Sequence, residues 1–204
     1  MKIKELDRTM RHRQCSYVAL RWRFRWAKSK KTIKMIIFIS GIHASGKGTI
    51  CKEIQEKTEY KHFTASELIK WKEISPENQK GVKNISSTQE RLLNALSVVK
   101  EDHLKILLDG HFVLFNSDLI PSAIDIKVFE DINPNAIICI EGDVEIIQQR
   151  LYSRDHINYD LDILKTMQNL ELAKAKECSL HLGVPLLIYG SEEPERLLTF
   201  INSL

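Results

Sequence analysis

The sequence predicts an α/β fold, a three-layer α/β/α sandwich in which helices cover both faces of a central parallel sheet of about five strands. Two observations predict this. Short apolar runs of strand length alternate with longer segments whose apolar residues recur at helical spacing. The chain can also bury a sizeable core, because 43% of its 204 residues are hydrophobic and 28% are charged. We therefore expect one globular domain over residues 35–204, preceded by a short extension.

The first expected strand, Met35 to Ile39, leads through a glycine-rich turn into a helix from Gly48 to Lys57. Small residues in the turn let backbone N–H groups surround a polyphosphate, while the dipole of the following helix points at it. Lys47 adds an ammonium group that can reach the β and γ oxygens. We therefore predict a phosphate-binding loop for ATP, formed by Gly41, His43, Ala44, Ser45, Gly46, Lys47, Gly48 and Thr49.

Gly48 departs from the usual phosphate-loop pattern, in which Ser or Thr directly follows the lysine and holds Mg2+. Here Thr49 comes one residue later. The Gly-Lys-Gly-Thr sequence resembles that of adenylate kinases and other nucleoside-monophosphate kinases. The resemblance implies a metal held mostly through water and a threonine at the α-phosphate.

Thr64 and Ser66 follow a short strand expected at Lys61 to Phe63, and Thr64 is a suitable helix cap. Ligands of parallel sheets bind beyond the carboxyl ends of the strands. Both side chains are therefore placed near a site for a phosphate acceptor. The alternative is that they only cap the helix.

A polar stretch from Ile74 to Ile85 is expected to be a loop. The spacing of Ser87 and Glu90 is that of a capping box, which predicts that the next helix starts there and runs to about Glu101. Gln89, at its start, is a candidate contact for the acceptor; the alternative is a solvated side chain. The apolar stripe of this helix is expected at Leu92, Leu93, Leu96 and Val99.

Asp109 and His111 follow an apolar strand expected at Leu104 to Leu108. An acidic residue at the end of a buried strand, in a chain with a phosphate loop, is the expected anchor for Mg2+ and its water shell. The alternative for Asp109 is that it caps a turn. His111 is expected to position a water or an acceptor oxygen, or else to pack as a hydrogen-bonded histidine.

Arg150 and Arg154 lie four residues apart at the end of a helix expected from Asp143, and therefore on one helical face. Phosphoryl transfer spreads negative charge over the migrating group, and arginines stabilise that charge without proton transfer. We expect both to belong to a short lid over residues 150–160; the alternative is an ordinary surface role in salt bridges.

The rest of the domain is expected to continue the alternation, although residues 112–121 show no clear periodicity. The further elements are a strand at Ala136 to Ile140, a long helix from Asp160 to Leu182, a strand at Val184 to Tyr189 and a helix from Pro194 to the end.

Four segments together look like the compact adenylate-kinase-like P-loop proteins, namely Gly41 to Thr49, Asp109-x-His111, Arg150 to Arg154 and Gln168-x-x-Glu171. The resemblance is closest to the small group that includes a ribosome-maturation adenylate kinase and ATPase, and it covers roughly residues 35–204. It implies ATP on the loop, an acceptor nucleotide between the Thr64 and Gln89 helices, and backbone near Gly190 beside the adenine. The acceptor region lacks the arginine that larger adenylate kinases use for the AMP phosphate.

The first 34 residues carry most of the basic charge. They hold 12 Lys and Arg against Glu5 and Asp7, a net charge of +10, whereas the rest of the chain, with 18 basic and 25 acidic residues, has −7. Apolar and cationic residues alternate from Leu20 to Trp26, a pattern that can bind RNA or an anionic surface. The alternatives are a disordered extension or a mis-annotated start, since Met35 opens the first strand.

The four cysteines are scattered, which favours reduced thiols in a cytoplasmic protein, and no apolar run is long enough to span a membrane. The favoured function is transfer of the ATP γ-phosphate to a nucleoside monophosphate, AMP by default, with Mg2+ as cofactor. An ATPase switch acting on a ribonucleoprotein or protein partner, and a kinase of another small metabolite, remain alternatives.

Overall fold

The computed structural model describes residues 34–70, 85–116, 120–190 and 194–204. The predicted loop over residues 74–85 therefore lies almost wholly outside the described residues, as does the basic extension.

In chain order the elements are β1 (Met35–Ser40), α2 (Lys47–Lys57), β2 (Lys61–Thr64), α3 (Ala65–Leu68), α5 (Ile85–Asp102), β3 (Lys105–Asp109), β4 (Val113–Phe115), β5 (Pro121–Ala123), α6 (Ile126–Ile132), β6 (Ala136–Ile140), α7 (Val144–Asp155), α8 (Leu161–Leu182), β7 (Leu186–Tyr189) and α9 (Pro194–Asn202).

The central sheet has five strands in the order β2-β3-β1-β6-β7, and every neighbouring pair is parallel. This confirms the predicted α/β fold and strand number. β1 lies between β3 and β6, so the strand order changes direction at β1. The loop that follows the carboxyl end of β1 therefore lies at this point of the sheet. Ligands of open parallel sheets bind at such a point.

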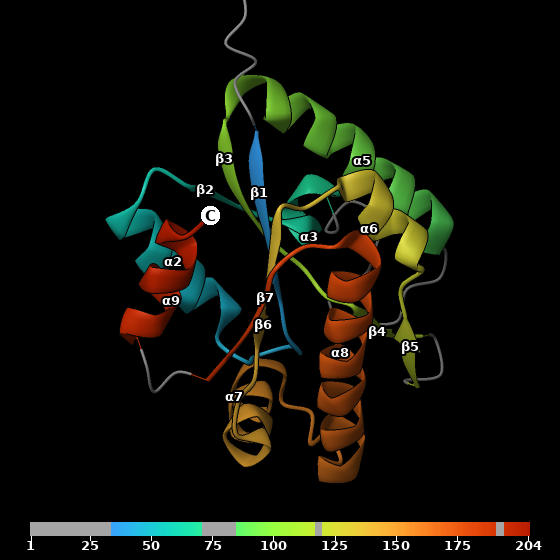
Figure 1. Cartoon of the computed structure of the whole chain (residues 1–204). Helices are drawn as coiled ribbons and strands as arrows, with labels where there is room; N and C mark the ends of the chain where they lie inside the picture. Colours follow the sequence, from blue (N-terminus) through green and yellow to red (C-terminus); the bar gives the residue numbers. More distant parts are fainter. Residues whose placement is uncertain (1–33, 71–84, 117–119, 191–193) are drawn as a thin grey trace, which may run out of the picture. The chain divides into compact units, whose positions relative to one another are not determined.

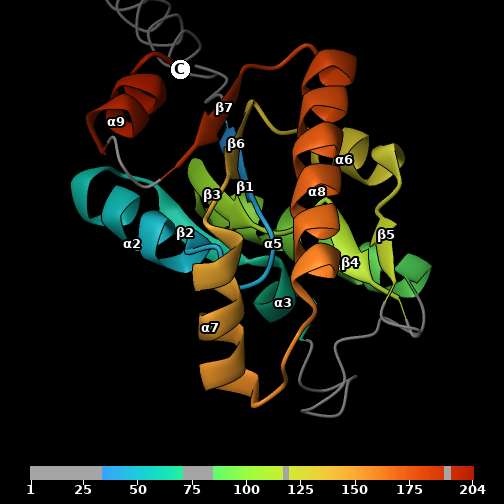
Figure 2. The same ribbon diagram turned by 90° about the horizontal axis from the view of Figure 1, so that it is seen from below.

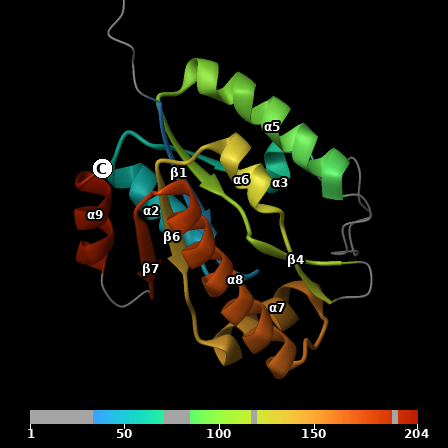
Figure 3. The same ribbon diagram turned by 45° about the vertical axis from the view of Figure 1, so that its right-hand side comes forward.

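Helices cover both faces of the sheet (Figures 1 and 2). Alternate residues of the strands point to opposite faces, so Ile37 and Ile39 belong to one core cluster, with α2 and α9, and Ile36 and Phe38 to the other, with α5, α6 and α8. Both faces are buried, which explains the nearly continuous apolar runs of β1 and β6. Figure 3 shows α5 beside α3 and α6, against which it packs.

The caps of the helices agree with the sequence. Asp143 and Asp160 accept hydrogen bonds from backbone N–H groups at the starts of α7 and α8. Gly183 ends α8 with a positive φ of 65°, the left-handed conformation in which glycine carries no steric cost. Thr64 and Glu67 form a reciprocal capping box at α3.

One prediction on an element was wrong, and one stretch had been left unassigned. The capping box does not start at Ser87, because α5 begins at Ile85 and this serine lies inside the helix. A Ser-x-x-Glu pattern marks a start only where the residues before it are not helical, and here Ile85 and Ser86 already are. The unassigned stretch after Phe112 contains the antiparallel hairpin of β4 and β5, and α6 follows it.

Within the described residues, no helix is both long and apolar enough to cross a membrane.

Candidate functional site

A cavity of about 1450 Å³ opens at the carboxyl ends of the strands. Ligand sites of single small molecules measure about 300–1,000 Å³, so the cavity is large enough for two ligands. The predicted site residues that line it are His43, Ala44, Ser45, Gly46, Lys47, Gly48, Thr49, Thr64, Ser66, Gln89, Asp109, His111, Arg150, Arg154 and Gly190.

Gly41 starts the loop with a backbone that only glycine adopts easily. Its φ is +146°, and a Cβ there would lie 2.8 Å from the carbonyl oxygen of Ile140 and 2.8 Å from Ser45 Oγ. The loop then passes through Ala44 in the left-handed region, with φ 62°, and α2 begins after Gly46. Ser45 Oγ is buried and has no hydrogen-bond partner among the described residues, which leaves it as a donor for a ligand.

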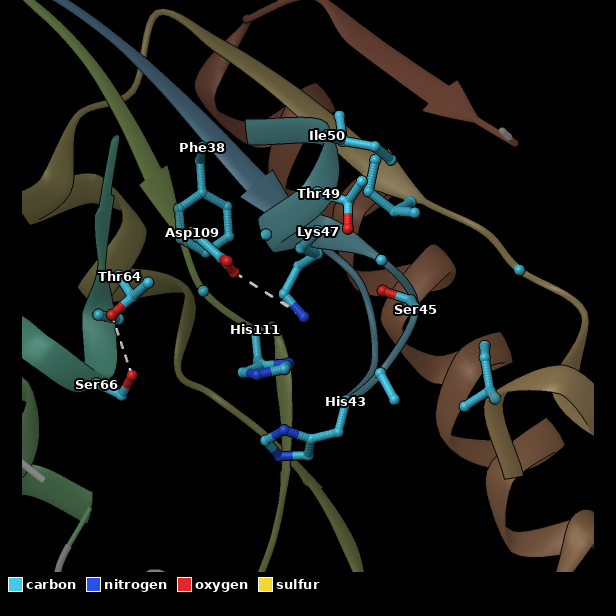
Figure 4. A pocket seen from close by; sticks show the side chains of 18 of the residues that line it. Phe38, His43, Ser45, Lys47, Thr49, Ile50, Thr64, Ser66, Asp109 and His111 are labelled. Carbon is cyan, nitrogen blue, oxygen red and sulfur yellow. Dashed lines mark hydrogen bonds and ion pairs between the residues drawn. The ribbon is translucent and has the colours of Figure 1, made fainter. Parts of the chain in front are cut away.

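Lys47 lies at the first turn of α2 and extends its side chain across the mouth of the loop (Figure 4). Its Nζ donates to the carbonyl oxygens of Gly41 at 2.9 Å and Ile42 at 3.1 Å. It also lies 3.9 Å from Asp109 Oδ1. Burial lowers the pKa of Lys47, and the charges of Asp109 and Glu171 oppose that shift.

Glu171 holds the start of the loop in place from the middle of α8. Its Oε1 accepts from the N–H groups of Gly41 and Phe112, both at 2.9 Å, and its Oε2 accepts from Val113 N–H at 2.7 Å. The carboxyl group therefore connects the segment after β1 to the segment after β3. Burial raises its pKa from 4.5 to about 7, against the opposing effect of the three N–H donors and Lys47. The sequence indicates Glu171 only through the resemblance of the Gln168-x-x-Glu171 stretch. Its contacts cannot be predicted from the sequence, because its partners are 58 to 130 residues away.

Asp109 ends β3 and is the acidic residue nearest to Lys47 in the site. Its second oxygen, Oδ2, lies 3.6 Å from Nε2 of His62, which belongs to the neighbouring strand β2. Sequence reasoning missed His62, because a single histidine in a short strand carries no signal before the strand register is known. The parallel pairing of His62 with Leu107 and of Thr64 with Asp109 brings it to the site.

His111 lies against His43 of the loop, with ring centroids 4.2 Å apart. Burial lowers the pKa of His111 well below 6.5, and the charges of Lys47 and His43 add to the effect. The imidazole is therefore neutral at physiological pH, so one ring nitrogen can accept a hydrogen bond from a water or a hydroxyl group.

Arg150 and Arg154 approach the loop from α7, and both line the cavity, as expected for residues on one helical face. Arg150 Nη1 donates to the carbonyl oxygen of Ala44 at 3.3 Å. Arg154 Nε donates to Asp155 Oδ1 at 3.0 Å. Only residues 156–160 separate α7 from α8, so no subdomain is inserted here.

Thr64 and Ser66 lie on the opposite side of Asp109 and His111 from the loop (Figure 4). Their hydroxyl oxygens are 3.1 Å apart, and Thr64 Oγ1 also accepts from Glu67 N–H at 3.1 Å. Thr64 therefore caps α3 and lines the cavity at the same time. Gln89 of α5 completes this side, and Gly190 lines the cavity directly after β7.

A family model described as an AAA domain matches residues 40–168, a segment that includes the loop, Asp109 and both arginines. No curated protein matches the chain.

Three solved structures resemble the chain at low sequence identity, which shows a common fold. A shikimate kinase from Acinetobacter baumannii has a TM-score of 0.54 at 13% identity, covering 83% of this chain and 94% of that one. A sugar kinase from Janibacter sp. HTCC2649 has a TM-score of 0.53 at 16% identity, covering 83% and 93%. A deoxyadenosine kinase from M. mycoides has a TM-score of 0.51 at 17% identity, covering 83% and 100%.

Proposed function

Since the matched region spans more than half of the sequence, the chain belongs to the AAA domain family of P-loop nucleotide-binding proteins, and we propose that it is a small-molecule kinase. It transfers the γ-phosphate of ATP to a nucleoside monophosphate, with AMP as the default acceptor. The observation that carries the proposal is a single cavity lined on one side by a phosphate loop and on the other by Thr64, Ser66 and Gln89.

The volume and the arrangement of the cavity support two ligands. At about 1450 Å³ it exceeds the usual size of a site for one small molecule, about 300–1,000 Å³. ATP phosphates bind to the loop at the start of α2, and Gly190 lies beside the adenine. The acceptor lies against α3 and α5, and its phosphoryl-accepting oxygen faces Asp109 and His111. Solved structures of the same fold include a deoxyadenosine kinase and a shikimate kinase, which supports a small-molecule acceptor.

Phosphoryl transfer from ATP requires neutralisation of negative charge rather than a covalent intermediate. Lys47, Arg150 and Arg154 all line the cavity and provide that charge from two helices. Arg150 hydrogen-bonds the loop itself, so it is already next to the phosphates. His111, held neutral, has one N–H that can donate to the accepting phosphate oxygen, and its other ring nitrogen can accept a hydrogen bond from water.

The residues of the site fit Mg2+, which prefers oxygen ligands and retains several waters. Asp109 offers a carboxylate and Thr49 a hydroxyl, and both line the cavity at the loop. When bound there, Mg2+ would neutralise the phosphates of ATP.

An acceptor screen tests the proposal. Purified full-length chain is incubated with ATP and each ribo- and deoxyribonucleoside monophosphate, and also with deoxyadenosine, shikimate and simple sugars, in a coupled assay for ADP. We expect AMP or another nucleoside monophosphate to accelerate ADP formation. Acceleration by shikimate or a sugar alone would contradict the acceptor assignment, and phosphate release that no acceptor accelerates would contradict the kinase.

An ATPase switch is the second candidate, favoured by the net charge of +10 on residues 1–34. In this case hydrolysis at the same loop would change the state of a partner that contains RNA. Deletion of residues 1–34, with RNA retention measured at two salt concentrations, tests whether this extension binds RNA, because phosphate contacts weaken steeply with salt. If neither salt nor the deletion changes RNA retention, the basic extension is not an RNA-binding segment.

A further inference from the structure

Three potential metal ligands from three different elements meet beside the phosphate loop. Cys51 of α2, His62 of β2 and Asp109 of β3 each offer one ligand atom, and these atoms all lie within 4.8 Å of one another. They form no sequence motif, because 11 and 47 residues separate them along the chain.

The strand register explains why they meet. In parallel strands, paired residues point to the same face of the sheet. His62 pairs with Leu107, and Asp109 follows Leu107 by two residues in β3. Leu107 packs in the same core cluster as Cys51, under α2. His62 and Asp109 therefore face α2 as well, and Cys51 is on the buried side of that helix.

His62 provides a second and independent observation. Its Nε2 is buried and makes no hydrogen bond within the part of the chain that the structure describes. Asp109 Oδ2 lies 3.6 Å from this nitrogen, which is too long for a hydrogen bond. Asp109 presents its other oxygen, Oδ1, to Lys47. A buried imidazole nitrogen without a hydrogen bond thus lies 3.6 Å from a carboxylate oxygen, a separation close to that of two ligands of one metal ion.

We propose that Cys51, His62 and Asp109 form a binding site for a divalent transition metal, with Zn2+ as the favoured ion. Zinc takes sulfur, imidazole and carboxylate ligands together, in tetrahedral geometry with bonds of about 2.0–2.3 Å. Adjacent ligand atoms are then about 3.3–3.8 Å apart, so a small inward movement of the three side chains suffices. Water fills the fourth position. Mg2+ does not compete for these three ligands as a set, because it requires oxygen.

Binding requires the Cys51 thiol to lose its proton. The S–H bond breaks as the metal–sulfur bond forms, and the proton passes to solvent.

Zinc binding has a consequence for turnover, which rests on the proposed function. The ion would occupy Asp109, the residue assigned to Mg2+ support, so zinc would inhibit phosphoryl transfer. The binding site itself does not depend on that function.

The direct test titrates reduced full-length chain with Zn2+ against a coloured chelator, and separately with Co2+, whose bond to a thiolate gives a charge-transfer absorption. We expect one equivalent to bind with a cobalt–thiolate band. In Cys51→Ala the band should disappear, and in His62→Ala the affinity should fall at least about tenfold. Cys139→Ala is the matched control, because Cys139 is equally buried, lies in β6 and belongs to the other core cluster.

Undiminished binding in Cys51→Ala, or absence of the cobalt–thiolate band in the original chain, would overturn the site; circular dichroism of each variant shows whether it is folded. Turnover gives a separate readout. Cys51→Ala should keep its ATP turnover and resist zinc. If the original chain binds zinc but has no turnover, the site stands and the proposed function fails.

Discussion

The two sides of the cavity are held in place in different ways. On the phosphate side, Gly41 N–H is bound by Glu171, 130 residues later, and the carbonyl oxygen of Ala44 by Arg150, 106 residues later. On the opposite side, the side chain of Thr64 hydrogen-bonds Ser66 and Glu67, no more than three residues away, while its backbone pairs with Asp109 in the sheet. The phosphate loop is thus held by side chains from distant parts of the fold, whereas the side-chain hydrogen bonds at the start of α3 are local.

This difference indicates which side of the cavity tolerates substitution and which side does not. A substitution of the Thr64 or Ser66 side chain removes hydrogen bonds that stay within the start of α3. Movement of the loop requires that α8, and with it the segments after β1 and β3, also move. We infer that the acceptor side can adapt to different molecules while the nucleotide side stays fixed, and the following predictions test that separation.

A large effect on turnover is expected for Arg150→Ala, which removes a charge next to the loop. Loss of one preorganised charge-stabilising group typically lowers kcat by about 10²–10³-fold. Arg91→Ala is the control, because Arg91 is exposed on α5 and does not line the cavity. A kcat unchanged from the original chain would exclude Arg150 from the transfer step.

Glu171 should make stability depend on pH. Its pKa is raised by burial from 4.5 to about 7, so the folded state binds the proton more tightly than the unfolded state does. The free energy of unfolding should therefore fall as pH rises from 4.5 to 7 and stay level above, by about 3 kcal/mol in total. Denaturant unfolding of the original chain and of Glu171→Gln across this range isolates the effect, because the variant cannot titrate. A difference between the two that does not vary with pH would contradict the shift.

Glu171→Gln should also weaken ATP binding without affecting the acceptor. Glutamine offers one acceptor oxygen where glutamate offers two, so one of the three N–H groups that fix the loop loses its partner. We expect about tenfold lower ATP affinity, close to 1.4 kcal/mol, with the acceptor KM unchanged. Glu177→Gln, an exposed position on the same helix, should bind ATP normally. An equal rise of the acceptor KM would show that the two sides are not separate.

The smallest effect is expected for Ser66→Ala, on the acceptor side. Loss of one exposed hydroxyl contact should raise the acceptor KM by about 2- to 10-fold, while ATP affinity stays the same. Ser97→Ala, exposed on α5 and outside the cavity lining, is the matched control. A change in ATP affinity instead would place Ser66 on the nucleotide side.

The sequence could predict the parts of the site that depend on neighbouring residues, but not the contacts between distant segments. The loop from Gly41 to Thr49, the capping of α3 by Thr64 and the strand ending in Asp109 were predictable, because each is a local pattern between neighbouring elements. The contacts of Glu171 and His62 were not, since they depend on the packing of α8 and on the β2–β3 register.

The missed helix α6 had a usable signal. Asp125 precedes Val128, Phe129 and Ile132, and its side chain accepts from Lys127 N–H in the structure. This cap, and apolar residues three and four apart, favour a helix. The hairpin before α6 was not recognised, because its strands of three residues are too short to show alternation. Without it, the start of the helix could not be placed.

Lys47→Ala tests most directly whether the loop binds the phosphates of ATP. ATP affinity is measured by titration and turnover by ADP release, with Lys52→Ala, an exposed position on the same helix, as control. Removal of a charged donor should cost about 1.5–3 kcal/mol, roughly 10- to 150-fold in affinity, and abolish turnover. A Lys47→Ala chain that binds and turns over ATP as well as the original would contradict the assignment of the loop.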